Sequence, residues 1–228
     1  MKSLIEKKYQ FIKQIVCDEG YEKEIDWQSQ IEFKNIDESY FLKELSWVIL
    51  SSGMKEQIIR RIFYEITPYF YNWKSAKKIV KNKQKCFSRS IKLFNNEKKI
   101  SAIIDSAEII NKITFEKLKK QIEYEPIEIL KEFPFIGNIT AYHLAKNIGI
   151  NVAKPDRHLV RIANDEGFNN VQEFCELISE LSGDSVPVVD IVLWRFANLH
   201  KNYLDVLSSV NFSHQEQDEI EYEQEVFQ

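Results

Sequence analysis

Few residues in this sequence interrupt a helix, since its 228 residues include only six glycines and five prolines. The sequence also has little of the strict alternation of apolar and polar residues that a half-buried β-strand shows. Apolar residues instead recur three and four positions apart, as they do along 41–49, 58–66 and 100–110. We therefore predict an all-α fold of roughly ten helices, in a chain long enough to bury a core without covalent cross-links.

Cysteine and histidine are scarce, and neither is clustered. Cys17, Cys86 and Cys175 lie far apart, and none of the four histidines is followed by another at helical spacing. This pattern provides no paired spacing for a disulfide framework, a zinc site or an iron–sulfur cluster. We expect buried or idle thiols and none of these cofactors.

Long apolar runs are also missing, because no stretch approaches the roughly 18 residues that indicate a membrane span. The first ten residues alternate charged and apolar side chains and lack the apolar core of a signal peptide. We expect a cytoplasmic protein that acts as a monomer and has no membrane partner.

The formal net charge of −4 is distributed unevenly. Residues 215–228 hold six acidic residues and no lysine or arginine, which predicts a disordered acidic tail. Between Lys74 and Lys99, ten basic residues accompany a single acidic one, Glu97. This stretch is a candidate surface for DNA phosphates. The alternative is a solvated lysine-rich face with no nucleic-acid role.

A tight turn joins two predicted helices, 127–133 and 138–148. The segment reads Phe133-Pro134-Phe135-Ile136-Gly137-Asn138-Ile139-Thr140-Ala141. Two short helices joined through such a turn can present consecutive backbone N–H groups at a helix N-terminus, and these bind a phosphate without reading base sequence. An ordinary corner between two core helices is the alternative for this segment taken alone.

An aspartate begins the next predicted helix, in the segment Lys154-Pro155-Asp156-Arg157-His158-Leu159-Val160-Arg161. Aspartate is a favoured N-cap residue, so a purely structural cap is one interpretation. Three side chains that can carry positive charge follow it within five residues: Arg157, His158 and Arg161. Such a group fits a surface that grips a DNA strand around a carboxylate.

Together the two segments resemble the helix–hairpin–helix DNA glycosylase superfamily, whose members include endonuclease III and the glycosylases for 8-oxoguanine and 3-methyladenine. The family's hairpin reads approximately Leu-Pro-Gly-Val-Gly-x-x-Thr-Ala, and its acid lies in a Val-Asp-x-His-x-x-Arg-Val context. Residues 41–54, which include Trp47-Val48-Ile49-Leu50-Ser51-Ser52-Gly53, also resemble the family's early helix and the loop that enters the DNA. The resemblance implies two helical lobes with a cleft between them, one formed by 38–150 and the other by 1–37 with 151–214.

The resemblance also implies hydrolysis of the N-glycosidic bond of a damaged or modified base that is flipped out of duplex DNA, leaving an abasic site. Asp156 would stabilise the positive charge that grows on the deoxyribose and would orient the attacking water. A non-catalytic helix–hairpin–helix DNA-binding module is the alternative function, and a helical interaction protein with no nucleic-acid role is a further one. The target base, and whether the DNA is the cell's own or foreign, stay open.

Two positions depart from the family's hairpin. Phe135 stands where the family has its first glycine, and Ile139 stands where members with lyase activity place a lysine. Because that lysine forms the Schiff base for strand cleavage, we expect no lyase activity. Lys154 is an amine close to Asp156, but it lies outside the family's lysine position.

The resemblance assigns roles to residues in several segments. The expected DNA contacts come from the hairpin, the residues after Asp156 and the loop that fills the vacated base position: Phe135, Gly137, Asn138, Ile139, Thr140, Arg157, His158 and Met54. The nominated base-pocket residues are Glu44, Trp47, Asp190 and Trp194, and the alternative for each is core packing or a structural hydrogen bond. The main-chain carbonyls that would hold a monovalent cation, Na⁺ or K⁺, are those of Lys131, Phe133 and Ile136.

Overall fold

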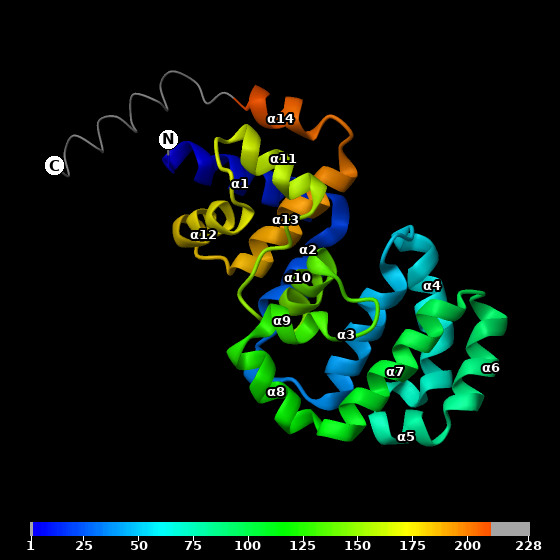
Figure 1. Ribbon diagram of the computed structural model, residues 1–228. Helices are drawn as coiled ribbons and strands as arrows, with labels where there is room; N and C mark the ends of the chain where they lie inside the picture. The colour runs from blue at the N-terminus through cyan, green and yellow to red at the C-terminus, as the bar shows by residue number, and fades with distance from the viewer. Residues whose placement is uncertain (1, 211–228) are drawn as a thin grey trace. The chain divides into compact units, whose positions relative to one another are not determined.

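Helices form all the regular secondary structure of residues 2–210, the part of the chain that the computed structural model describes (Figure 1). The all-α prediction is confirmed. The expected number of helices is too low, because the described residues contain fourteen α-helices and three short 3-10 or π-helical segments. The apolar periodicity runs through breaks such as Gly20, whose φ is 85°, and therefore does not reveal them. The acidic segment 215–228 lies outside the described residues.

The chain divides into two compact units, which are described separately below. One unit consists of residues 30–154, and the other combines residues 2–29 with residues 155–210. The structure thus separates them at 29/30 and 154/155, whereas the sequence suggested 37/38 and 150/151. The cleft expected between the lobes stays a prediction. Each helix within residues 2–210 is too short or too polar to span a bilayer.

The unit 30–154 is built around the apolar helix α3. Phe41, Leu45 and Ile49 of α3 are almost completely buried, and α7 and α10 both pack against this helix. The helical segments of this unit are η2 (Phe33–Asn35), α3 (Glu38–Ser51), α4 (Glu56–Ile66), η3 (Thr67–Trp73), α5 (Ala76–Lys81), α6 (Lys83–Leu93), α7 (Glu97–Ile113), α8 (Phe115–Tyr124), α9 (Pro126–Lys131) and α10 (Asn138–Asn147).

The other unit is built around α13, in which ten residues are buried. Polar contacts join the N-terminal segment to Asp184, which lies just before α13. The Tyr9 hydroxyl donates to the Asp184 carboxylate at 2.6 Å, and Lys13 forms an ion pair with the same carboxylate at 2.7 Å. The helical segments of this unit are α1 (Lys2–Val16), η1 (Cys17–Tyr21), α2 (Glu22–Ser29), α11 (Arg157–Asp165), α12 (Val171–Ser182), α13 (Val186–Leu199) and α14 (Tyr203–Ser209).

Gly149 ends α10 at a point of very close backbone contact. Its φ is +86°, and a Cβ atom at this position would lie 2.6 Å from the backbone nitrogen of Phe33. Only glycine therefore allows the segment before α3 to pack against the end of the hairpin's second helix.

We predict that Gly149→Ala lowers the free energy of unfolding by about 3 kcal/mol or more, because backbone atoms must move to admit the methyl group. Gly53→Ala is the matched control in the same unit, since Gly53 has a similar φ of +68° and a Cβ there would meet no atom within 4 Å. Gly53→Ala should lower the free energy of unfolding by only about 1 kcal/mol, the cost of holding an alanine in a left-handed conformation. Urea unfolding measures both, and equal losses would contradict the contact.

Candidate nucleic-acid interface

The turn between α9 and α10 is anchored to the core on both sides of an exposed residue. The Phe133 ring packs edge-on against Phe41 of α3 at a centroid distance of 5.7 Å, and Ile136 is 6% exposed. The Ile136 N–H closes the turn by donating to the Phe133 carbonyl at 3.1 Å. Phe135, between these two anchors, is 43% exposed. The predicted hairpin is therefore formed, and its tip faces outward.

Phe135 adopts the backbone conformation of a glycine. Its φ is +69°, in the left-handed region that ordinary residues rarely enter. Phenylalanine at the family's first glycine position thus leaves the turn intact, at a conformational cost of about 1–2 kcal/mol. The turn forms with phenylalanine at this position.

The first turn of α10 has backbone N–H groups that no residue within the helix can accept. Its first intrahelical bond runs from the Ala141 N–H to the Gly137 carbonyl at 2.9 Å, so the N–H groups of Asn138 and Ile139 precede the regular pattern. The Gly137 N–H is already used, because it donates to Thr140 Oγ1 at 2.7 Å. Of the residues expected to contact phosphate, Asn138 and Ile139 therefore present the better-placed amides.

Gly137 itself is not required by the local fold. Its φ of −110° is accessible to any residue, and a Cβ there would meet no atom within 4 Å. A glycine in this position leaves the start of α10 open to close approach by a ligand. This openness supports the interpretation of the segment as an anion site.

A buried lysine connects the hairpin to the loop that follows α3. Lys99, in the first turn of α7, is 3% exposed, and its ammonium donates to the carbonyls of Leu50 and Ser52, at 2.6 Å each. The same ammonium lies 5.7 Å from the centroid of the Phe135 ring. Two segments expected to contact DNA, the 51–54 loop and the hairpin, are thereby brought to the same part of unit 30–154. No sequence pattern indicated this bridge.

Met54, the residue nominated to fill the space of an extruded base, lies at the end of this loop. Its side chain is partly buried against the core, and its N–H donates to the Ser51 carbonyl at 3.0 Å. A wedge role for Met54 stays a prediction.

Asp156 caps α11, as the sequence predicted. One carboxylate oxygen accepts hydrogen bonds from the backbone N–H groups of His158, at 2.9 Å, and Leu159, at 3.2 Å. The side chain is partly exposed, while Arg157 and Arg161 are exposed. The His158 ring meets the Tyr203 ring edge-on, with Nδ1 3.4 Å from the Tyr203 hydroxyl. The capping bonds hold the carboxylate in place at the positive end of a helix.

No protein-family model matches the chain, and no curated protein matches it either. Two solved structures do match. The 8-oxoguanine glycosylase/lyase of Methanocaldococcus jannaschii, in complex with a 15mer DNA containing 8-oxoguanine, is 17% identical; the match covers 84% of this chain and 98% of that one, with a TM-score of 0.53. The 8-oxoguanine DNA glycosylase of Thermotoga maritima is also 17% identical. That match covers 85% of this chain and 96% of the other, with a TM-score of 0.55. The chain has the fold of the helix–hairpin–helix DNA glycosylases.

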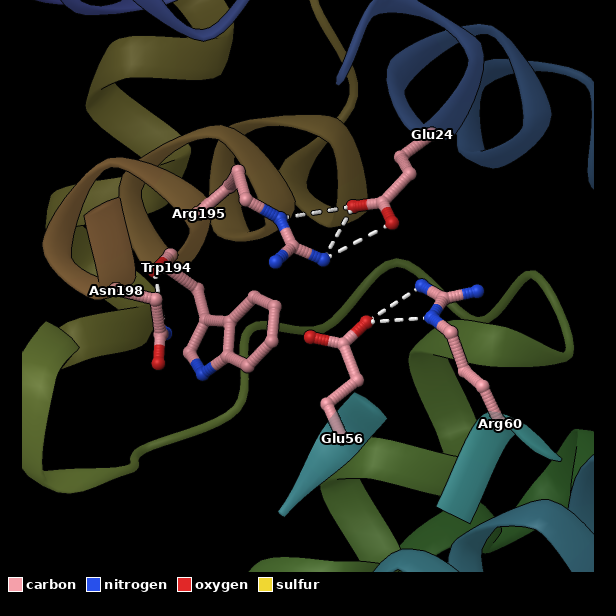
Figure 2. Close-up of polar contacts among 6 residues, drawn as sticks. All are labelled: Glu24, Glu56, Arg60, Trp194, Arg195 and Asn198. Atoms are coloured by element: carbon pink, nitrogen blue, oxygen red, sulfur yellow. Dashed lines mark hydrogen bonds and ion pairs between the residues drawn. The ribbon is translucent and has the colours of Figure 1, made fainter. Parts of the chain in front are cut away.

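Within the glycosylase fold, the two nominated pocket residues of α3 make structural contacts. Glu44 is 4% exposed and accepts a hydrogen bond from the Asn147 side chain of α10 at 3.0 Å. Burial raises the pKa of Glu44, although Lys43 and the bond from Asn147 act in the opposite direction. The Trp47 ring meets Phe63 edge-on at 5.3 Å and lies under the Arg60 guanidinium at 5.7 Å. Arg60 is itself paired with Glu56 (Figure 2). A base-binding role for Glu44 and Trp47 stays a prediction.

The two nominated residues of α13 differ in exposure. Asp190 is 1% exposed, whereas Trp194 is partly exposed. The Arg195 guanidinium lies 4.7 Å from the Trp194 ring and 4.3 Å from that of Tyr21. Two of its nitrogens bond to the Glu24 carboxylate at 2.7–3.0 Å (Figure 2). Sequence inspection missed this cluster, which restrains the indole of Trp194.

The basic stretch 74–99 contains nine exposed cationic side chains and one buried one. The exposed side chains are compatible with a phosphate-facing surface. Lys99 is the exception, and counting it with that surface was wrong, because its charge is used inside the protein. A lysine that finds two carbonyl acceptors at a helix end can be buried, and composition alone does not distinguish it from a solvated one.

The carbonyls nominated for a monovalent cation belong to Lys131, the last residue of α9, and to Phe133 and Ile136 in the turn that follows. The Phe133 carbonyl also accepts the hydrogen bond from Ile136, but a carbonyl oxygen has two lone pairs and can serve both. The donor chemistry therefore fits Na⁺ or K⁺, and the occupancy stays a prediction.

Lys99 should give unfolding a measurable pH dependence. Burial lowers the pKa of Lys99 from 10.5 to about 8, so the unfolded chain binds more protons than the folded chain between these pH values. Relative to Lys99→Met, the wild type should become more stable as the pH rises through this range. Chemical unfolding of both proteins at a series of pH values measures this difference in stability. The exposed neighbour provides the control Lys98→Met, and wild-type and Lys99→Met curves that run parallel would contradict the prediction.

Proposed function

We propose that this chain is a DNA glycosylase that hydrolyses the N-glycosidic bond of a damaged or modified base in duplex DNA and leaves an abasic site. The main support is the position of Asp156 in a chain with the glycosylase fold. Its carboxylate is fixed by two backbone hydrogen bonds, partly exposed, and followed by the exposed Arg157 and Arg161. We further propose that it acts as a monomer.

In the proposed mechanism, the first-turn amides of α10 bind a phosphate of the strand that carries the target base. That grip supports extrusion of the nucleotide, and a residue of the 51–54 loop occupies the space that the base leaves. As the C–N bond lengthens, positive charge grows on the deoxyribose. The Asp156 carboxylate stabilises that charge and orients the water that attacks the sugar. The base leaves with the electron pair of the C–N bond, and the proton that the water loses neutralises it.

We propose that the chain lacks lyase activity, and the reason is the residue at position 139. It occupies the family's lysine position in the first turn of α10, and its apolar side chain is 43% exposed. An isoleucine cannot form the Schiff base through which lyases cleave the sugar–phosphate backbone. One of the two matched structures is described as a glycosylase/lyase. This chain would differ from that protein in the second reaction.

Asp156→Asn tests the catalytic role with little effect on the fold, because asparagine is as good an N-cap as aspartate. We expect base release to fall by about a hundredfold or more, while affinity for DNA is retained. The assay is single-turnover base release from duplexes that each carry one modified base, beginning with 8-oxoguanine, for which both matched proteins are named.

Asp165→Asn, at the exposed end of the same helix, is the matched control and should leave base release unchanged. If Asp156→Asn retained full base release, the catalytic assignment would be wrong. DNA binding without base release from any duplex would favour a non-catalytic DNA-binding module.

Ile139→Lys tests the basis of the missing lyase activity. The wild-type protein should give strand breaks only after alkali treatment, because it leaves an abasic site. The variant should gain some alkali-independent breaks and a covalent adduct that borohydride traps on abasic DNA. Ile139→Met, which adds no amine, is the control. A trapped adduct with the wild type would contradict the proposal, and Lys154→Met would then show whether Lys154 supplies the amine.

A further inference from the structure

Phe135 is an unfavourable residue for its place in the fold. Its φ of +69° is a conformation that glycine adopts more readily, and 43% of the residue is exposed. Its neighbours Phe133 and Ile136 belong to the buried core and account for the anchoring of the turn. A strained backbone that carries an exposed aromatic ring suggests a function for the ring outside folding.

The ring is held by a group that is costly to bury. Lys99 keeps its ammonium inside the protein, where it bonds to the carbonyls of Leu50 and Ser52 and lies near the face of Phe135. Carbonyls in the last turn of a helix lack partners within the helix, so the ammonium satisfies groups at the end of α3. The same charge attracts the aromatic ring. One side chain thus restrains the loop after α3 and the tip of the hairpin.

We propose that Lys99 is a positioning residue for DNA binding, which acts by holding the Phe135 ring and the 51–54 loop in one arrangement. This role rests on the proposed glycosylase function. The ring would pack against the nucleotide next to the phosphate that the first-turn amides of α10 bind. Asn138 begins that turn three residues after Phe135. A nucleotide offers both a base face and the C–H face of its deoxyribose to such a ring.

A purely structural role for the pair predicts a different result. If Phe135 and Lys99 only stabilised the fold, replacing either would lower stability, and DNA affinity would fall only as the folded fraction falls. If the ring contacts DNA, Phe135→Gly should lower affinity while the melting temperature stays level or rises, because glycine adopts the left-handed conformation without strain. Stability and affinity then change independently.

The test is a double-mutant cycle of Lys99→Met and Phe135→Gly. The ligand is a duplex with one stable abasic-site analogue, and the measurements are its dissociation constant and the melting temperature of the free protein. We expect each single variant to weaken binding about tenfold, and the double variant to bind about as well as the weaker single variant, because both remove the same contact. Lys112→Met, which removes an exposed charge from the other end of the same helix and outside the stretch 74–99, should change affinity about twofold or less.

Independent, multiplicative losses in the cycle, or unchanged affinity in Phe135→Gly, would overturn the role of Lys99. If Lys99→Met does not fold, Phe135→Gly decides alone: weaker binding at an unchanged or higher melting temperature supports the contact, and unchanged binding overturns it. Base release is not needed for this measurement. A wild-type protein that fails to bind the duplex would overturn this inference and the proposed function together. Binding with independent losses would overturn this inference alone.

Discussion

Helix ends need hydrogen-bond partners, and in this protein that requirement shapes the candidate site. The described residues are folded into many short helices, so a large share of the backbone lies within one turn of an end, where N–H and C=O groups lack partners inside the helix. Lys99 satisfies carbonyls at the end of α3, Thr140 accepts the Gly137 N–H before α10, and Asp156 accepts two N–H groups of α11. Each of these residues, or its immediate neighbour, is also one that the function would use.

This coincidence has a physical reason. A group that completes a helix end is held in a defined position by backbone geometry, and a site needs side chains held in that way. The start of α10 shows the complementary case. Its N-cap is a glycine, which has no side chain to accept the N–H groups of the first turn, so an acceptor from outside the protein can take them. The fixed side chains and the unpaired backbone N–H groups therefore both result from the need of helix ends for hydrogen-bond partners.

The sequence predicted local features well and long-range ones poorly. The turn around Gly137 and the cap at Asp156 were predictable because each depends on residues within a few positions of one another. The burial of Lys99 was not, since its acceptors at Leu50 and Ser52 are almost fifty residues away and a lysine-rich stretch indicates a solvated surface. The bond between Glu44 and Asn147 spans 103 residues. No spacing rule could have found it.

Phe135 illustrates the same limit within the hairpin. A phenylalanine rarely adopts a left-handed conformation, yet Phe135, which stands in place of the family's glycine, has a φ of +69°. The reason lies in the anchors: Phe133 and Ile136 are buried on either side, and their packing fixes the path of the chain between them. Packing of the neighbours therefore overrides the preference of the residue itself, and only the three-dimensional structure shows it.

The capping bonds of Asp156 also bear on the kind of catalysis that this carboxylate can provide. The backbone N–H groups of His158 and Leu159 hold the Asp156 carboxylate at the first turn of α11, so its charge has a defined position. A carboxylate held in this way is suited to stabilising a cationic sugar, which needs a negative charge in a fixed place. A hydrolytic glycosylase needs this property. Capping α11 and stabilising a cationic sugar therefore both require a carboxylate that is held in place at position 156.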